Sequence, residues 1–194
     1  MSNRKGDRNM TPAQEQLLKD SRIDISGYIN NETGMYVREA ILRSLSNGKP
    51  SPEIMIHITS PGGGGTIAAD IYDMIKFYPG KTVGVVHGTA HSAAATILQA
   101  CDWRVATAHS SILIHNMKHD GTRLDNDTPQ DPVRIQELIN VQLRRYRLFA
   151  FHTRKPEAEI RRVCGLNRPM TADEALDFGL IDQIITKGGE IKHD

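Results

Sequence analysis

The stretch TVGVVHGTAHSAAATILQA, residues 82–100, decides the fold class of this 194-residue chain. Its β-branched residues at 82–86 predict a strand, and the small and apolar residues from Ala93 to Ala100 predict a helix. Ser92 stands in the turn between them. A serine at this position either caps the helix or exposes its hydroxyl group for chemistry, although the motif differs from the G-x-S-x-G turn of α/β-hydrolases.

Strand and helix patterns alternate on both sides of this stretch. We expect further strands at 22–27, 54–59, 103–106, 112–115 and 183–185, and helices at 11–18, 34–47, 66–77, 132–152, 157–163 and 171–178. Repeated strand–helix units predict an α/β fold with a mostly parallel sheet and helices on its faces. Ligands in such folds bind where strands end and helices begin, which is where Ser92 lies.

Composition excludes several classes of protein. The chain has 24 Lys and Arg against 23 Asp and Glu, so its net charge of +1 does not favour nucleic acid or an anionic membrane. Cys101 and Cys164 form no CxxC pattern, and we expect buried free thiols, no metal site and no cofactor. The polar N-terminus lacks a secretory apolar segment and no apolar run is long enough to span a bilayer, so we expect a cytoplasmic protein.

Three short motifs could do chemistry. Residues 60–65, Ser-Pro-Gly-Gly-Gly-Gly, predict a turn whose backbone N–H groups can bind an anionic oxygen. Residues 88–95 carry Ser92, and residues 110–116 carry His115 at the end of an apolar strand, where an imidazole can act as a general base. Taken singly, each motif also has an ordinary interpretation: a tight connection, a helix cap and a structural histidine.

In this order and spacing the three motifs resemble those of ClpP, the proteolytic subunit of the caseinolytic protease. The resemblance runs from about residue 22 to residue 185 and includes a closing helix and strand after Thr171. It implies a ClpP/crotonase-type α/β fold of repeated βαβ units, in which residues 132–152 form a long inter-ring helix. The domain division that we predict is a flexible N-terminal arm at 1–20 and a ClpP-like peptidase domain at 21–194.

The resemblance implies a serine endopeptidase, a hydrolase that cleaves peptide bonds inside a self-compartmentalised ring. It assigns Ser92 as the nucleophile, His115 as its base, and the N–H groups of Gly63 and Ala93 as the oxyanion hole. At the position of the family's catalytic aspartate this chain has Asn167. An asparagine can orient an imidazole but supplies no negative charge, so we expect slow hydrolysis.

The resemblance also implies partners. It implies a homo-oligomeric ring, expected as two stacked heptamers, that takes peptides or unfolded polypeptides and can be served by an AAA+ ATPase or a second ClpP paralogue. Met55 and His57 stand where the family often has aromatic residues in its ATPase-docking pocket, and residues 165–166 replace a charged pair. His91 stands where a small residue is usual, and we expect it to pack or to line the pocket.

Two other functions stay open. The chain could be a weakly active or regulatory ClpP-like subunit of a mixed ring, as Asn167 and the altered docking strand suggest. A crotonase-type acyl-CoA enzyme would share the fold, but its acidic catalytic residues are not evident.

The basic residues Arg144, Arg145 and Arg147 of the long helix are expected on a solvated or subunit-facing surface.

Overall fold

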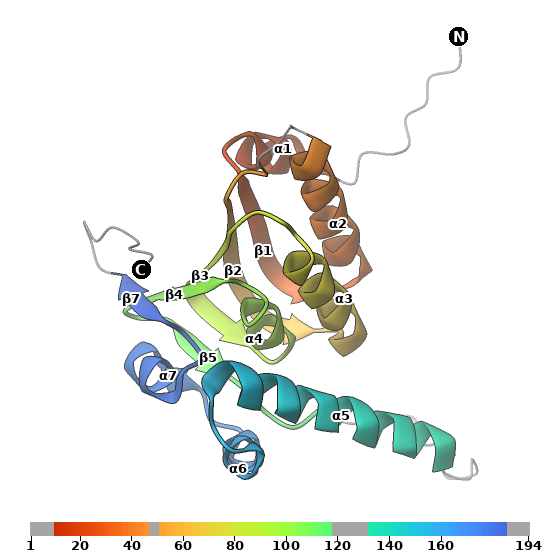
Figure 1. Ribbon diagram of the computed structural model, residues 1–194, viewed down its shortest axis with the longest axis vertical. Coiled ribbons are helices and arrows are strands. Elements are labelled where there is room, and N and C mark those ends of the chain that lie inside the picture. The colour runs from red at the N-terminus through yellow and green to blue at the C-terminus, as the bar shows by residue number, and fades with distance from the viewer. Residues whose placement is uncertain (1–9, 47–50, 118–131, 186–194) are drawn as a thin grey trace.

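The computed structural model describes residues 10–46, 51–117 and 132–185. Its elements in chain order are α1 (Pro12–Lys19), β1 (Arg22–Ile29), α2 (Asn31–Ser46), β2 (Ile54–Gly63), α3 (Gly65–Lys76), β3 (Thr82–His91), α4 (Ala93–Leu98), β4 (Trp103–Thr107), β5 (Ser111–Leu113), α5 (Pro132–Thr153), α6 (Glu157–Leu166), β6 (Met170–Thr171), α7 (Ala172–Phe178) and β7 (Gln183–Ile185). The predicted α/β fold is confirmed. The long helix α5 extends beyond the body of the molecule (Figure 1).

The sheet is built on parallel strands in the order β1-β2-β3-β4-β7. Strand β3 forks: its residues 83–86 pair with β4, and its residues 89–91 pair with β5. Strand β6 then adds to β5 in the antiparallel direction. The fork brings the ends of β3 and β5, which precede Ser92 and His115, to the same edge of the sheet.

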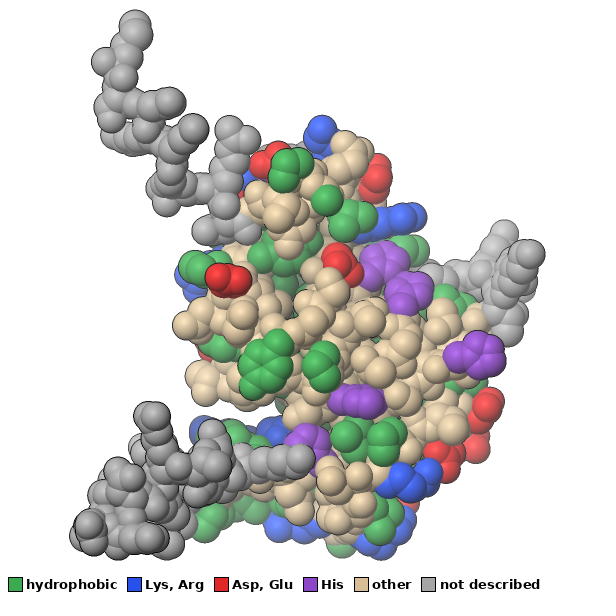
Figure 2. Space-filling model, turned by 180° about the vertical axis from the view of Figure 1, so that it is seen from behind, with side chains coloured by type: hydrophobic (Ala, Val, Ile, Leu, Met, Phe, Trp, Pro, Cys, Tyr) green, Lys and Arg blue, Asp and Glu red, His purple; other side chains and the backbone are tan. Residues whose placement is uncertain are grey.

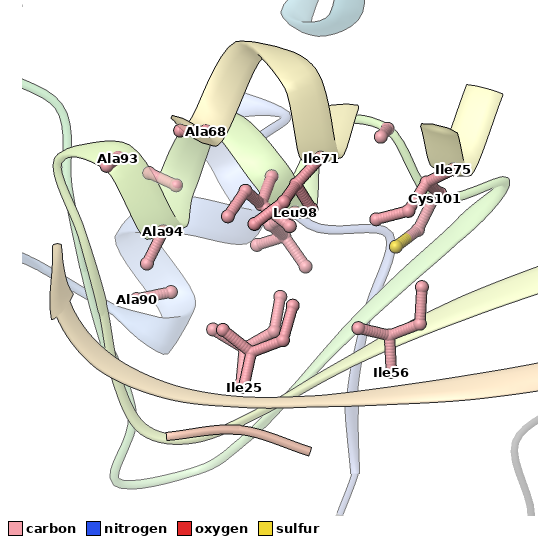
Figure 3. Packing of buried hydrophobic residues seen from close by; sticks show 14 of the residues in the cluster. Ile25, Ile56, Ala68, Ile71, Ile75, Ala90, Ala93, Ala94, Leu98 and Cys101 are labelled. Carbon is pink, nitrogen blue, oxygen red and sulfur yellow. The ribbon is translucent and has the colours of Figure 1, made fainter. Parts of the chain in front are cut away.

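The main core lies between the sheet and helices α2, α3 and α4. Ile25 and Ile56 extend from the strands towards Ile71 and Leu98 on the helices (Figure 3). Helix α4 packs so closely on β3 that a Cβ atom at Gly84 would lie 2.7 Å from Leu98 Cδ1. Burial of these aliphatic side chains stabilises the fold by about 1.5–3 kcal/mol for each side chain, so the core holds α4 firmly.

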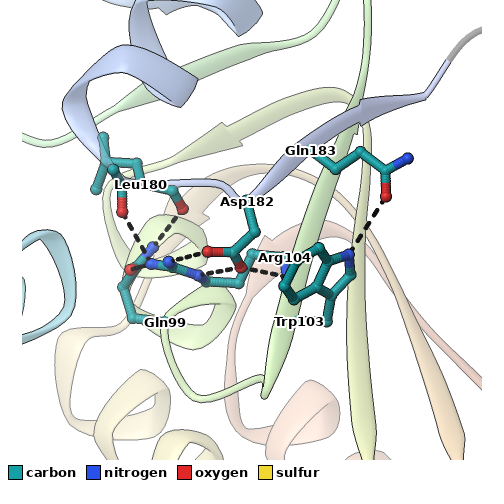
Figure 4. Close-up of polar contacts among 7 residues, drawn as sticks. Gln99, Trp103, Arg104, Leu180, Asp182 and Gln183 are labelled. Carbon is teal, nitrogen blue, oxygen red and sulfur yellow. Dashed lines mark hydrogen bonds and ion pairs between the residues drawn. The ribbon is translucent and has the colours of Figure 1, made fainter. Parts of the chain in front are cut away.

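A buried ion pair joins β4 to the segment before β7. Arg104 pairs with Asp182, with 2.6 Å between Arg104 Nη2 and Asp182 Oδ1, and its Nε–H donates to the other carboxylate oxygen at 2.9 Å (Figure 4). The same guanidinium donates to the Gln99 side chain and, at 3.0 Å, to the carbonyl oxygen of Gly179. These bonds fix the C-terminal strand against the end of α4.

The ends of several elements differ from the prediction. Strand β2 runs on to Gly63 through the predicted turn, because after a register shift between Ser26 and Tyr28 of β1 its glycines pair with the end of that strand. Strand β3 reaches His91, whereas the strand that carries His115 stops at Leu113. The short strand β6 was not predicted.

Helix α6 also runs past its predicted end at residue 163. Gly165 lies inside the helix, and Asn167 is the left-handed residue that ends it, with φ 49° and ψ 38°. Asparagine adopts this conformation more readily than most residues, which explains why the helix stops here and not at the glycine.

The N-terminal region contributes to the core. Thr11 and Gln14 form a capping box for α1, and Met10 and Leu18 are buried in the main cluster. Residues 1–9 of the predicted arm lie outside the described residues, as does the predicted loop at 118–131. Cys101 and Cys164 are free and buried, as expected. None of the helices in the described ranges is long and apolar enough to cross a membrane.

Candidate active site

Ser92 is held in a strained backbone conformation at the junction of β3 and α4. Its φ of 56° and ψ of −114° are unusual for a residue with a side chain and cost about 1–3 kcal/mol. Its N–H donates to the carbonyl oxygen of Leu113 at 2.8 Å, which ties it to β5. Although Ser92 occupies the N-cap position, its side chain makes no capping hydrogen bond, so the interpretation as a simple helix cap is wrong.

Ser92 and His115 line the same cavity. The cavity has a volume of about 1030 Å³ and lies between the carboxyl ends of the strands and helices α3 and α5. Both predicted oxyanion residues, Gly63 and Ala93, line it as well. The fold thus brings four of the five predicted site residues together from three separate segments of the chain.

The glycines of the first motif approach the serine closely. A Cβ atom at Gly62 would lie 2.8 Å from Ser92 Cβ and 2.7 Å from the carbonyl oxygen of His91. Gly62 also has a φ of +103°, which side chains other than glycine's hydrogen rarely allow. Ala93 is the first residue of α4, and the first N–H groups of a helix have no partner within it. The Gly62 backbone and the N–H group of Ala93 therefore lie next to Ser92.

His115 has a defined tautomer in this arrangement. Its Nδ1 is hydrogen-bonded to the carbonyl oxygen of Asn116, and because a carbonyl can only accept, Nδ1 must carry the proton. The other nitrogen, Nε2, then has a lone pair when the ring is neutral. A general base needs that lone pair.

A model of the Clp protease family matches residues 4–188. The chain belongs to the Clp protease family. The ATP-dependent Clp protease proteolytic subunit 3 of Frankia casuarinae is 32% identical over 183 residues, which cover 93% of this chain and 84% of the relative. Proteolytic subunit 2 of the same organism is also 32% identical over 183 residues, or 82% of its length.

A solved structure agrees with this assignment. An asparagine-to-aspartate mutant of ClpP1 from Listeria monocytogenes matches with a TM-score of 0.74 and 27% identity, over 89% of this chain and 95% of that one. Clp proteases are serine endopeptidases, so this Clp family member is a hydrolase of peptide bonds.

Asn167 is the one predicted site residue that does not line the cavity. It is exposed at the end of α6, and within the described residues its side chain makes no hydrogen bond. The register of strands β5 and β6 nevertheless relates the position of Asn167 to that of His115. Strands β5 and β6 pair Ser111 with Thr171 and Ile112 with Met170, and the same antiparallel register continued by three residues would set Asn167 opposite His115.

His91 packs beside the site. Its Nε2 lies 2.9 Å from the hydroxyl oxygen of Ser111, and burial, followed by the nearby His115, lowers its pKa below the ordinary value. His91 is therefore neutral at pH 7. The packing role expected from the sequence fits these contacts better than a role as a second base.

The sequence prediction missed a pair of basic residues in the cavity. Arg144 and Arg145 on α5 line it together with Val141 and Leu148. Residues 141, 144, 145 and 148 lie on one face of the helix, and Arg147 lies outside that face. This spacing is the only signal in the sequence that could have shown that Arg145 and Arg147 have different surroundings. Among the residues that the structure describes, no group of three or more His, Cys, Asp and Glu side chains could hold a metal ion.

Proposed function

We propose that Ser92 is the nucleophile of this Clp protease, that His115 is its base, and that the N–H groups of Gly63 and Ala93 bind the oxyanion. The observation that carries the proposal is the strained, uncapped Ser92 in one cavity with His115. Strain of this kind is common at catalytic residues, because it presents the side chain in a fixed direction.

The reaction then has two halves. Ser92 Oγ attacks the peptide carbonyl carbon while its proton moves to His115 Nε2, and the negative carbonyl oxygen accepts hydrogen bonds from the two N–H groups. The imidazolium gives the proton to the departing amine, which leaves an acyl-enzyme. Water then loses a proton to His115, adds to the acyl carbon, and Ser92 recovers its proton as the acid product leaves.

We further propose that Asn167 orients His115 in the working enzyme, as the continued β5–β6 register suggests. Its amide oxygen can accept Nδ1–H in place of the Asn116 carbonyl oxygen, but it cannot stabilise the imidazolium by charge. Hydrolysis is therefore slow. The conformation described here, with Nδ1 bonded to its own neighbour, keeps the correct tautomer without fixing the ring against Asn167.

Substitution of the orienting residue tests this proposal. We expect Asn167→Asp to raise kcat on a small peptide ester by about tenfold or more, because a carboxylate stabilises the imidazolium that forms in the transition state. The matched control is Asn31→Asp, at the exposed start of α2, which should leave kcat unchanged. An unchanged or lower kcat in Asn167→Asp would remove Asn167 from the site.

We propose that the working protein is a homo-oligomeric ring, with two stacked heptamers as the expected form. Large apolar side chains on the single chain support this: Phe77 is 86% exposed and Phe151 is 78% exposed. Figure 2, which views the molecule from behind, also shows hydrophobic side chains at the surface. Light scattering of the purified chain at micromolar concentration should give the mass of an oligomer, and a monomer mass would contradict the proposal.

The surface expected to receive an AAA+ ATPase carries a pair of histidines in this chain. His57 and His87 stack with ring centroids 5.2 Å apart, and His57 Nδ1 lies 3.0 Å from His87 Nε2. We therefore propose that any ATPase or second ClpP paralogue docks here through contacts other than aromatic packing.

A second candidate function, a regulatory subunit of a mixed ring, is favoured by the exposed position of Asn167 in the single chain. A neighbouring subunit could then be needed to complete the site. Peptidase activity that appears only when a second ClpP chain is added would support this function, and full activity of the purified homo-oligomer would exclude it.

A further inference from the structure

We infer that Arg145 is a specificity residue that binds a carboxylate of the peptide substrate. This rests on the proposed function, because the cavity that Arg145 lines is the one that contains Ser92 and His115. The inference concerns which peptides are preferred and goes beyond the peptidase activity itself.

Arg145 is half-buried, and part of its guanidinium is buried without a partner. Its Nη2 atom is buried and has no hydrogen-bond partner. The ion pairs formed by other arginines in the described ranges do not include it. A buried charge without a counter-charge is costly, so an anion that enters the cavity would relieve a cost that the folded protein already carries.

Groups near Arg145 do not neutralise it. Burial lowers the pKa of Arg145, and the groups that act in the opposite direction are Cys164 and Tyr146. Burial raises the pKa of Cys164 to about 11 and also raises that of Tyr146, so both are uncharged at pH 7. Asp73 lines the same cavity but forms no ion pair with Arg145 in the described chain.

A carboxylate is the anion that a peptide substrate brings. An arginine side chain binds it through two parallel N–H···O bonds, which gives both affinity and orientation. The neighbouring Arg144 is exposed in the same cavity and adds a second positive charge. The carboxylate can belong to an aspartate or glutamate side chain near the scissile bond, or to the C-terminus of a short peptide.

Matched peptides separate these two sources. One series carries Glu, Gln or Lys at each position next to the scissile bond with an amidated C-terminus, and the other carries Gln with a free C-terminal carboxylate. For the oligomer as purified, we expect kcat/KM for the peptide with the recognised carboxylate to exceed that for its uncharged match by about tenfold or more. The Lys peptides should be the poorest substrates.

Two variants of Arg145 and one control variant assign the preference to this residue. Arg145→Met replaces the guanidinium by a side chain of similar reach without charge, and the ratio between acidic and uncharged peptides should fall to about one. Arg147→Met is the matched control on the same helix, because Arg147 is exposed and does not line the cavity, and it should keep the ratio. Arg145→Glu should reverse the preference towards Lys.

Equilibrium binding keeps the inference testable even if hydrolysis is too slow to measure. The same peptides are titrated into Ser92→Ala protein by calorimetry, where acidic peptides should bind about tenfold more tightly and Arg145→Met should remove the difference. Absent hydrolysis with intact acidic preference would contradict the proposed peptidase function alone. Equal binding of the amidated Glu peptides, the amidated Gln peptides and the Gln peptides with a free C-terminus would overturn the inference. An Arg145→Met variant that changes only the oligomeric state would also overturn it, since Arg145 would then pair across a subunit contact.

Discussion

Ser92 keeps its unusual backbone conformation because its surroundings hold it from two sides. Its N–H is bonded to the Leu113 carbonyl oxygen at 2.8 Å, and the Gly62 backbone packs against its Cβ. Neither contact comes from a residue next to Ser92 in the chain. The strain is therefore maintained by strands of the sheet on both sides of Ser92.

Gly62 should be sensitive to a single added methyl group. We expect Gly62→Ala to lower kcat/KM by about a hundredfold, because the new Cβ would push Ser92 or the His91 carbonyl group away by a large part of an ångström. The measurement is steady-state hydrolysis of a peptide ester, with circular dichroism to check folding.

Gly165→Ala is the matched control for this substitution. A Cβ atom at Gly165 has nothing within 4 Å, and the residue lies inside α6. Alanine there should leave kcat/KM unchanged and raise the free energy of unfolding by about 0.5–1 kcal/mol. Equal kinetics for both alanine variants would mean that Gly62 does not position the serine.

At the scale of elements, the contact between β4 and the segment leading to β7 depends on one buried ion pair. Arg104 is only 10% exposed at its side chain, and Asp182 is 22% exposed. We expect Asp182→Ala to lower the free energy of unfolding by about 3–5 kcal/mol, since it leaves the guanidinium without its counter-charge. Denaturant unfolding followed by tryptophan fluorescence measures this change, because Trp103 is adjacent to the pair.

The comparison substitution is Glu157→Ala, which breaks an exposed i,i+4 ion pair with Arg161. Its cost should be below about 1 kcal/mol. If Asp182→Ala cost no more than Glu157→Ala, the buried pair would not hold the C-terminal strand.

The elements that local sequence determines were predicted well. Helix α7 begins at the capping box of Thr171 and Glu174 and ends at the left-handed Gly179. Both signals were visible in the sequence and placed the two ends of the helix within a few residues. The motifs around Ser92 and His115 were also found, and the fold does bring them into one cavity.

Features that depend on distant partners were not predictable. The extension of β2 to Gly63 and the existence of β6 depend on pairing with β1 and β5, whose register no local pattern encodes. Arg145 was grouped with Arg144 and Arg147 because adjacent arginines on a helix look alike in sequence. The position of α5 against the strands shows that Arg144 and Arg145 line the cavity and that Arg147 does not.

For the molecule as a whole, acid should weaken the fold through His152. Its Nε2 lies 2.8 Å from the Tyr72 hydroxyl oxygen, and burial, followed by the charges of Lys76 and Arg104, lowers its pKa to about 4. An unfolded histidine titrates near pH 6.5, so between these values the unfolded chain binds more protons than the folded one. Stability should therefore be complete above about pH 6.5 and fall as the pH is lowered towards 4.

After discounting for partial exposure, we expect His152 to contribute roughly 1–2 kcal/mol of this loss. Unfolding free energies at pH 7 and pH 4.5 measure it, and His152→Gln should show a smaller difference between the two. The exposed His109→Gln variant should behave like the unchanged protein. An equal loss in His152→Gln and the unchanged protein would exclude this histidine as the cause.

The assembly of subunits concerns both the surface of the chain and its active site. Asn167 lies outside the cavity in the single chain, while Phe77, Phe151 and the extended α5 present apolar surface for contacts between subunits. If those contacts extend the existing β5–β6 pairing towards the end of α6, the continued strand register carries Asn167 to His115. Ring formation and catalytic competence would then be coupled.

Covalent labelling by a fluorophosphonate, read by peptide mass spectrometry, tests the central proposal most directly. The reagent reacts with a serine hydroxyl group that an adjacent base activates. We predict one labelled residue, Ser92, with no label in Ser92→Ala and none in His115→Ala over the same time. Label on another residue, or label that persists in Ser92→Ala, would show that Ser92 is not the nucleophile.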